Sequence, residues 1–119
     1  MLLTDIQKKV AREEAKYLQS YLEYASRIKK VAGRILQDPG LRVLVFGSVV
    51  KGQAIPGKSD VDILIVSRRI PRKAKRQAEL RARILKEIGD PLAPFEIHLA
   101  TPRLFEKWYK KRIDAYAEP

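Results

Sequence analysis

Residues 60–66 read DVDILIV, and this short run decides the fold of the chain. Its apolar, β-branched residues predict a buried strand. Alternate side chains of a strand point to opposite faces, so Asp60 and Asp62 are expected to share one face. Two adjacent carboxylates repel each other, and Mg²⁺ would remove that repulsion because it prefers carboxylate oxygen. The alternative is a strand end at the solvent edge with two solvated acids.

A second strand is predicted immediately upstream, over residues 41–46 (LRVLVF). Gly47 follows at once, and glycine there lets the backbone turn tightly or approach a ligand. Ser48 would begin a short helix over residues 49–54, where free N–H groups favour a phosphate. The alternative for Ser48 is an ordinary helix N-cap.

A third strand is predicted over residues 95–99 (FEIHL), and it carries a further acid, Glu96. A charge is seldom buried in such a strand without a partner. If this strand neighbours DVDILIV, three carboxylates could bind two Mg²⁺ ions about 4 Å apart. His98 shares the face of Glu96 and would orient that acid from outside the metal shell, or serve as a hydrogen-bonded structural histidine.

Helical periodicity accounts for most of the remaining chain. The predicted helices are one long or two kinked segments from about Thr4 to Gln37, a basic helix over 71–88, and a last helix from Thr101 that includes Tyr116. The order α-β-α-β-α-β-α indicates an α/β layered domain with a small mixed sheet of about three or more strands. The 119 residues allow one domain: an N-terminal helix (1–38), a core (41–100) and a C-terminal helix (101–119).

Composition limits the function classes. The net charge of +11 favours a polyanionic partner. The absence of cysteine excludes disulfides, thiol nucleophiles and Cys-ligated metals. No signal peptide or membrane span is predicted, so a cytoplasmic location is expected. The absence of Asn and the 33% of charged residues favour a heat-adapted, thermophilic source.

The segments 46–48 (FGS) and 59–63 (SDVDI) together resemble the DNA polymerase β nucleotidyltransferase superfamily. They are most similar to its stand-alone minimal nucleotidyltransferases, the MNT proteins that are often paired with HEPN-domain partners. The resemblance extends from about Leu41 to Leu99 with flanking helices, and it implies a polymerase-β-like palm.

The resemblance also implies roles for individual residues. Gly47 and Ser48 match the residues that hold the phosphates of a nucleoside triphosphate. Asp60 and Asp62 match the two acids that bind Mg²⁺, and Glu96 matches the third acid, which helps bind the catalytic metal and activates the attacking hydroxyl. The implied nucleotide-binding set also includes Lys51, Lys58 and Ser59.

Two departures from the family pattern lie in the nucleotide-binding loop. Eleven residues separate Ser48 from Asp60 where the motif usually has ten, and Lys51 replaces the usual Arg. Lysine keeps the charge but loses bidentate phosphate geometry. Lys58 would reach the β- and γ-phosphates, or it is an exposed loop lysine.

Two groups of side chains, one basic and one of tyrosines, suggest binding partners. Nine basic residues lie between Arg68 and Lys86, and they form either a nucleic-acid face or a solvated helix face. Tyr17, Tyr21 and Tyr24 follow helical spacing and would form core or the interface of a homo-oligomer.

The sequence thus predicts a Mg²⁺-dependent nucleotidyltransferase of the EC 2.7.7 type, with Mn²⁺ as an alternative metal. An acceptor hydroxyl would attack the α-phosphate of an NTP, with ATP expected, and pyrophosphate would leave. The resemblance implies a HEPN toxin as partner and AMPylation of its hydroxyl, so that the chain acts as antitoxin in a toxin–antitoxin pair. The alternatives are a binding module that neutralises its partner by contact, and a nucleic-acid-binding protein that uses the basic helix.

Overall fold

A four-stranded mixed sheet organises the protein, whose computed structural model describes residues 4–90 and 93–119. The strand order is β3-β2-β1-β4. The strands are β1 (Arg42–Phe46), β2 (Val61–Val66), β3 (Phe95–Ala100) and β4 (Tyr116–Ala117). β1 pairs antiparallel with β2 and β4, whereas β2 and β3 are parallel.

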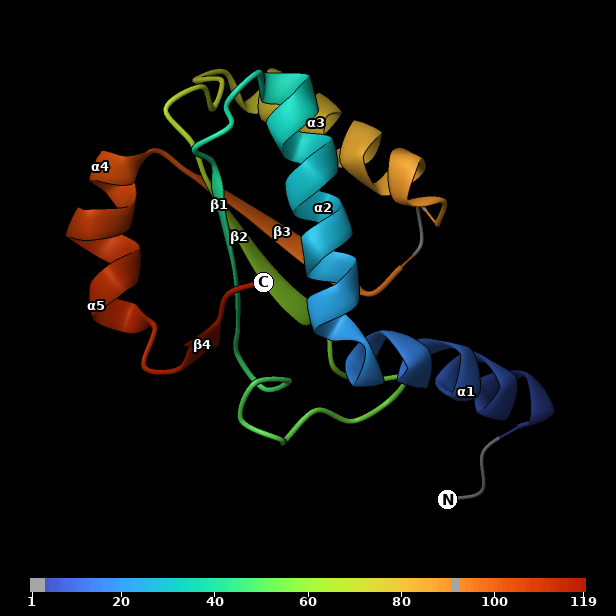
Figure 1. Cartoon of the computed structure of the whole chain (residues 1–119). Helices are drawn as coiled ribbons and strands as arrows, with labels where there is room; N and C mark the ends of the chain where they lie inside the picture. The colour runs from blue at the N-terminus through green and yellow to red at the C-terminus, as the bar shows by residue number, and fades with distance from the viewer. Residues whose placement is uncertain (1–3, 91–92) are drawn as a thin grey trace.

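Helices cover both faces of this sheet (Figure 1). The helical segments are α1 (Asp5–Gln19), α2 (Tyr21–Leu36), α3 (Ala74–Ile88), α4 (Pro102–Leu104), the π-helical turn η1 (Phe105–Tyr109) and α5 (Lys110–Arg112). α2 and α3 pack on one face, and the continuous C-terminal segment α4-η1-α5 covers part of the other. The predicted α/β class with a small mixed sheet is therefore confirmed.

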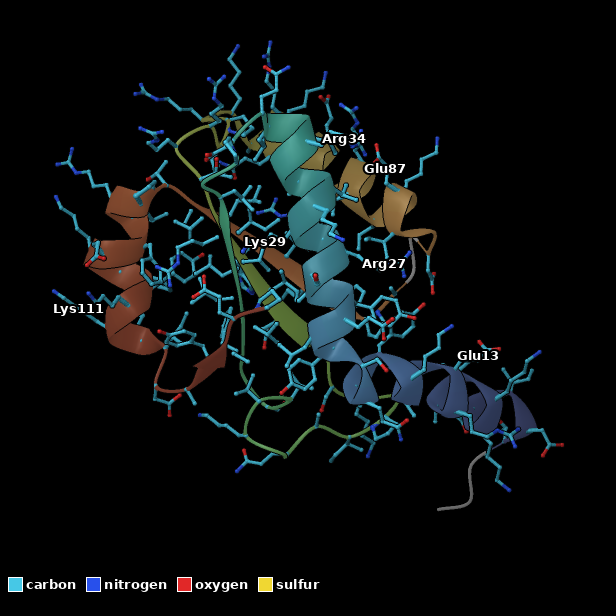
Figure 2. The ribbon with its side chains drawn as sticks, viewed as in Figure 1. Glu13, Arg27, Lys29, Arg34, Glu87 and Lys111 are labelled. Atoms are coloured by element: carbon cyan, nitrogen blue, oxygen red, sulfur yellow. The ribbon has the colours of Figure 1, made fainter. Side chains whose placement is uncertain are left out.

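The main core lies between the sheet and the pair α2 and α3. Alternation along β2 puts Val61, Ile63 and Ile65 on this face, as predicted, and all three are completely buried. They meet Ile28 from α2 and Ile84 from α3, which are also fully buried. Arg34 of α2 pairs with Glu87 of α3 at the rim of this core (Figure 2).

The opposite face of the sheet is divided in two. At one end a small core of Leu44, Leu64, Val66 and Ala100 lies beneath Phe105 of η1. At the other end the same face carries polar side chains. The C-terminal helical segment does not cover this part of the sheet, which is therefore open to solvent. This arrangement positions the candidate site.

The N-terminal helical region consists of two helices that meet at Ser20. α1 begins with a capping box between Thr4 and Gln7, and its first turns extend away from the body of the protein (Figure 1). Tyr17 is 4% exposed, and Tyr24 packs beside it, so these members of the tyrosine stripe belong to the core. Among the described residues, no helix is both long enough and apolar enough to cross a bilayer.

Two element predictions were wrong. Residues 49–52 form turns and residues 53–54 are irregular, where a helix was predicted, because the glycines that flank the first turn, Gly47 and Gly52, have positive φ angles of 82° and 71°. Tyr116 lies in β4 instead of in the last helix, since the chain leaves the helix at Ile113 and pairs with the free edge of β1. That pairing satisfies backbone groups that would otherwise be exposed on an edge strand.

Candidate active site

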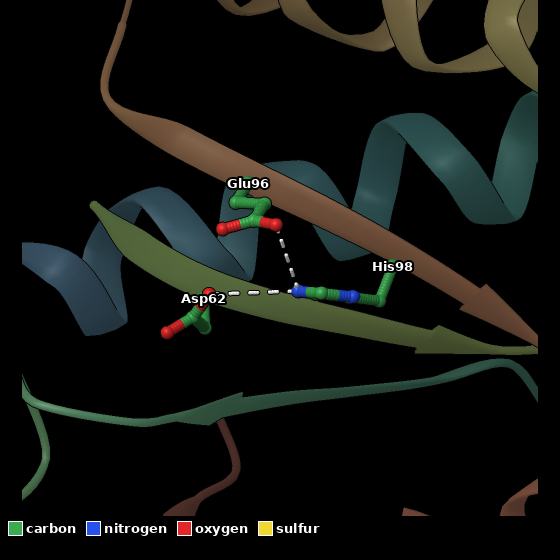
Figure 3. A group of neighbouring side chains, drawn as sticks. All are labelled: Asp62, Glu96 and His98. Atoms are coloured by element: carbon green, nitrogen blue, oxygen red, sulfur yellow. Dashed lines mark hydrogen bonds and ion pairs between the residues drawn. The ribbon is translucent and has the colours of Figure 1, made fainter.

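Three chemically reactive side chains meet on the open part of the sheet. Asp62 on β2 and Glu96 on β3 are direct register partners of the parallel pair, and His98 lies two residues further along β3. Nε2 of His98 is 3.5 Å from Oδ1 of Asp62 and 3.8 Å from Oε1 of Glu96 (Figure 3). One ligand atom from each residue lies within 4.8 Å of the other two. The sequence led us to expect that Glu96 approaches both Asp60 and Asp62, and the structure brings it to Asp62, whereas Asp60 is not part of this group.

Neighbouring aromatic rings hold the imidazole in this position. His98 contacts Phe46 of β1, with ring centroids 5.3 Å apart, and Tyr109 of η1, with centroids 6.2 Å apart. Burial raises the pKa of the Tyr109 phenol above its usual value. The His98 side chain is 27% exposed and the Glu96 side chain is 58% exposed. The aromatic rings thus pack against His98 while the cluster stays accessible from solvent.

Gly47 makes room for the Asp62 carboxylate. A Cβ atom on Gly47 would lie less than 3.0 Å from Oδ2 of Asp62, closer than real Cβ atoms approach. The φ angle of 82° at Gly47 is also one that residues with a side chain rarely adopt. The sequence suggested a tight turn or a close approach to a ligand here, and the structure shows the turn together with a close approach to the acid itself.

The chain after Gly47 forms a compact turn. The N–H of Lys51 donates to the carbonyl of Gly47 at 3.4 Å, and the N–H of Gln53 donates to the carbonyl of Ser48 at 2.9 Å. Ser48 therefore begins a turn instead of the predicted helix, and its side chain is half-buried beside the Gly47–Asp62 contact. Its role in phosphate binding stays a prediction.

Lys51 forms an ion pair with Asp114, a residue that the sequence did not suggest as part of the site. Its Nζ lies 3.0 Å from Oδ2 of Asp114, in the segment between α5 and β4. The hydrogen bond from Lys51 lowers the pKa of Asp114 below its usual range. Pairing of β4 with β1 brings the chain around Asp114 back beside the Gly47 turn, because Tyr116 is the register partner of Phe46. No local pattern in the sequence reveals this ion pair, since it depends on the strand that was not predicted.

The remaining predicted residues lie in the loop before β2. The Oγ of Ser59 accepts a hydrogen bond from the N–H of Ile55 at 2.9 Å and closes the loop. Lys58 is exposed on the same loop. Asp60 is also exposed, one residue before β2, and it is not part of the Asp62–Glu96–His98 group. Nucleotide binding by Lys58 and Ser59, and metal binding by Asp60, stay predictions.

The donor set of this cluster fits a divalent cation. Carboxylate oxygens are common ligands of Mg²⁺ and Mn²⁺, and carboxylate oxygen together with imidazole nitrogen is a common ligand set of Zn²⁺. The space left by Gly47 also keeps Oδ2 of Asp62 unhindered by a side chain at that position. A bound cation would supply charge neutralisation for a phosphate group at this site. The site can therefore bring an anionic phosphate to two acids that would otherwise repel it.

Comparison with known proteins identifies the family and the fold. The nucleotidyltransferase domain family matches residues 25–117, which include all the site residues named above. Two crystal structures, both described as those of putative nucleotidyltransferases, have a similar fold. The first is 31% identical with a TM-score of 0.58, and the match covers 79% of this chain and 95% of that one. The second, from Sulfolobus solfataricus, is 19% identical with a TM-score of 0.55 and covers 88% and 84%.

The chain belongs to the nucleotidyltransferase domain family. This family and fold support a transferase of the EC 2.7.7 type, for which nucleoside triphosphates and divalent metals are the general reactants and cofactors, and Asp62, Glu96 and His98 form a candidate metal-binding group. No functionally curated protein matches the sequence.

Proposed function

We propose that the protein is a divalent-cation-dependent adenylyltransferase that moves AMP from ATP onto a hydroxyl group of a partner protein. Mg²⁺ is the expected physiological cation. The proposal rests above all on one observation: the Gly47 turn is built against the carboxylate of Asp62, which is itself the register partner of Glu96. The turn to which we assign phosphate binding thus lies beside a pair of acids on the same sheet.

The proposed reaction is an in-line displacement at the α-phosphorus of ATP. The acceptor hydroxyl oxygen forms a bond to that phosphorus, and the bond to the oxygen that bridges to the β-phosphate breaks. Pyrophosphate carries away the electron pair, and the hydroxyl proton passes to a carboxylate oxygen of Glu96. Lys51 lies on the turn beside Asp62 and would contact the triphosphate oxygens as a point charge. Catalysis then consists mainly of positioning and charge stabilisation.

A protein acceptor is consistent with the openness of the site. The Glu96 side chain is 58% exposed and stands on an uncovered part of the sheet, so a side chain of another protein can reach it. The resemblance of the Gly-Ser and Asp-x-Asp segments to MNT proteins supports a HEPN-domain toxin as this partner. In that pairing the protein would act as an antitoxin by AMPylation of a toxin hydroxyl.

The test is incubation of the purified protein with ATP and Mg²⁺ and with a HEPN-domain protein from the same organism, followed by intact-mass spectrometry. We expect the partner to gain one or more adenylate units. The Asp62→Asn variant should give no gain while it still binds the partner. A complex that forms and neutralises the partner equally well with the Asp62→Asn variant would instead support the contact model.

A basic groove on the far side of the molecule favours a second function, nucleic-acid binding. It lies between the end of α2 and the start of α3 and has a volume of about 720 Å³. Nitrogen-tipped side chains gather at this end of the molecule (Figure 2). The cationic residues that line it are Arg69, Lys73, Lys75, Arg76 and Arg83, with Glu79 as the single acid among the described lining residues.

Such a groove suits the phosphate backbone of a nucleic acid more than its bases, because the described residues that line it include no aromatic ring for stacking. Binding of a labelled RNA or DNA oligonucleotide should therefore weaken steeply with added salt and show little sequence preference. The double variant Lys75→Glu, Arg76→Glu should abolish binding, whereas Arg103→Glu, Lys107→Glu on the C-terminal segment should not. Equal loss in both variants would indicate a nonspecific effect of net charge.

A further inference from the structure

We infer that His98 is a direct metal ligand, and that Asp62, Glu96 and His98 form a mixed nitrogen and oxygen site that selects transition-metal cations such as Mn²⁺ and Co²⁺ over Mg²⁺. This inference deepens the proposed function, since it concerns the metal used at the same site. It differs from the sequence expectation, in which His98 only supported the acids from outside the metal shell.

The distances around His98 favour a shared ion over a hydrogen bond. Its Nε2 is 3.5 Å from Asp62 Oδ1 and 3.8 Å from Glu96 Oε1. Ordinary hydrogen bonds between nitrogen and oxygen are about 2.7–3.2 Å long, so both separations are too long for good ones. Metal–ligand bonds of about 2.1 Å place adjacent ligand atoms about 3.0–3.5 Å apart. The separation between His98 and Asp62 is at the upper end of this range, that between His98 and Glu96 is slightly beyond it, and all three ligand atoms lie within 4.8 Å of one another.

The orientation of the imidazole supports the same conclusion. Nε2 is the atom of the ring that faces both carboxylates (Figure 3). The contacts with Phe46 and Tyr109 come from different elements, β1 and η1, and they fix the ring before any ion arrives. A ligand that is held in place in this way loses little side-chain freedom on binding.

The chemistry of the donors then sets the metal preference. Mg²⁺ favours oxygen ligands, whereas imidazole nitrogen is a good ligand for the later divalent metals. Replacement of one oxygen donor by nitrogen should therefore raise affinity for Mn²⁺ and Co²⁺ relative to Mg²⁺. Asp60 is exposed and lies outside the cluster. It therefore remains available to bind a second cation through oxygen ligands alone, together with oxygens of the triphosphate.

The sequence makes this inference unusually testable, because the chain contains one histidine and no cysteine. Any imidazole nitrogen bound to a metal in the tag-free protein must belong to His98. We would add Mn²⁺ without nucleotide and record electron spin echo envelope modulation, which detects ¹⁴N nuclei coupled to the bound Mn²⁺. We expect imidazole ¹⁴N modulation in the wild type and its loss in His98→Gln.

Metal competition supplies the second readout. His98→Gln should weaken Mn²⁺ and Co²⁺ binding by at least about tenfold, whereas Mg²⁺ binding should change by less than about threefold. Glu79→Gln, which removes an exposed carboxylate from α3 on the opposite face, serves as the control and should change neither.

Two outcomes would overturn the inference. One is Mn²⁺ that binds without ¹⁴N modulation, and the other is the lack of any Mn²⁺ binding in the absence of nucleotide. Neither measurement involves nucleotidyl transfer. A failure of the proposed transferase activity would therefore leave the metal result intact, and a failure of the metal result would leave the transferase proposal to its own test.

Discussion

The carboxylate of Asp62 occupies the space that a side chain on Gly47 would need. This relationship joins the two sequence signals of the site, the glycine after β1 and the acid on β2. Phe46 and Asp62 are register partners across the antiparallel pair, so Gly47 follows immediately beside the acid. Glycine is therefore required at position 47 for two reasons: its φ angle is positive, and the Asp62 carboxylate leaves no room for a side chain.

We predict that Gly47→Ala abolishes metal binding and nucleotidyl transfer while the protein still folds. The new methyl group would push the Asp62 carboxylate away from Glu96 and His98. Misplacement of a reacting group by about 1 Å can cost about 100-fold in rate, so a loss of at least this size is expected. Transfer assays and Mn²⁺ titration of the variant measure both effects.

Gly52→Ala is the matched control for this experiment. Gly52 lies in the same turn and also has a positive φ, but a Cβ there would meet no atom within 4 Å. Both variants should lose some stability through backbone strain, by about 1–2 kcal/mol. Equal loss of metal binding in both would show that strain in the turn is responsible, and that the contact with Asp62 is not.

The ion pair between Lys51 and Asp114 predicts a change in nucleotide affinity. A triphosphate that recruits Lys51 must compete with the Asp114 carboxylate, which lies 3.0 Å away. Asp114→Asn should therefore bind a nonhydrolysable ATP analogue about twofold to threefold more tightly, and Lys51→Met should bind it about tenfold more weakly. Isothermal titration calorimetry gives both affinities.

Lys107→Met on the C-terminal segment controls for the loss of one positive charge. Lys107 is exposed within η1, so its removal should leave the affinity nearly unchanged. An Asp114→Asn variant that binds the analogue more weakly would show that Asp114 helps to place Lys51 instead of competing for it.

Much of the fold was predictable from the sequence because alternation and helical periodicity are local. The DVDILIV pattern indicated which residues of β2 enter the core, and the closeness of Glu96 to Asp62 followed once β3 was assumed to neighbour β2. The segment after β1 was not predicted correctly. It forms a turn in place of the expected helix, since two of its glycines have positive φ angles.

Features that depend on distant segments were beyond the reach of local patterns. β4 has two residues, Tyr116 and Ala117, and forms only because β1 offers it a free edge. The ion pair of Asp114 depends on that pairing. The aromatic contacts of His98 likewise join three separate segments, so the sequence left its role open between an orienting and a structural histidine.

A buried pair at the other end of β2 gives a stability prediction with a defined pH dependence. The hydroxyl of Ser67 donates to Oδ2 of Asp38 at 2.7 Å, and the N–H of Gly40 donates to Oδ1 at 3.1 Å. The bond from Ser67 is the largest cause of a pKa of Asp38 below its usual range. A carboxyl whose pKa is lowered by folding stabilises the native state above its unfolded pKa, about 3.9.

We therefore expect Ser67→Ala to lower Tm by several degrees at pH 7. The difference from the wild type should shrink below about pH 4, because protonation of Asp38 removes the advantage of the charged form. Thermal unfolding followed by circular dichroism between pH 3 and pH 7 measures it. Ser20→Ala is the control, since Ser20 makes no side-chain cap bond. A gap that stays constant over this pH range would assign the effect of Ser67 to packing.

Tyr17 provides the last prediction, because it anchors α1 to the rest of the protein. Its ring lies 4.8 Å from that of Tyr24 and 5.3 Å from that of Phe95, and its hydroxyl donates to Asp90. Burial, and then the bond to Asp90, raises the pKa of Tyr17 above its usual value. The neutral phenol thus contributes stability below about pH 10, and this contribution is lost at higher pH as the unfolded chain ionises.

Tyr17→Ala should destabilise the protein by about 3–5 kcal/mol and expose the amides of α1 to rapid hydrogen exchange. Tyr17→Phe keeps the ring contacts and loses only the bond to Asp90, so it should cost about 1–3 kcal/mol at pH 7 and less above pH 10. Tyr116→Ala, at a position that is 53% exposed, should leave α1 protected. Unchanged exchange of α1 in Tyr17→Ala would place the anchor elsewhere, for example where Ala11 lies near Gly57, since a Cβ added to Gly57 would be 3.5 Å from the Cβ of Ala11.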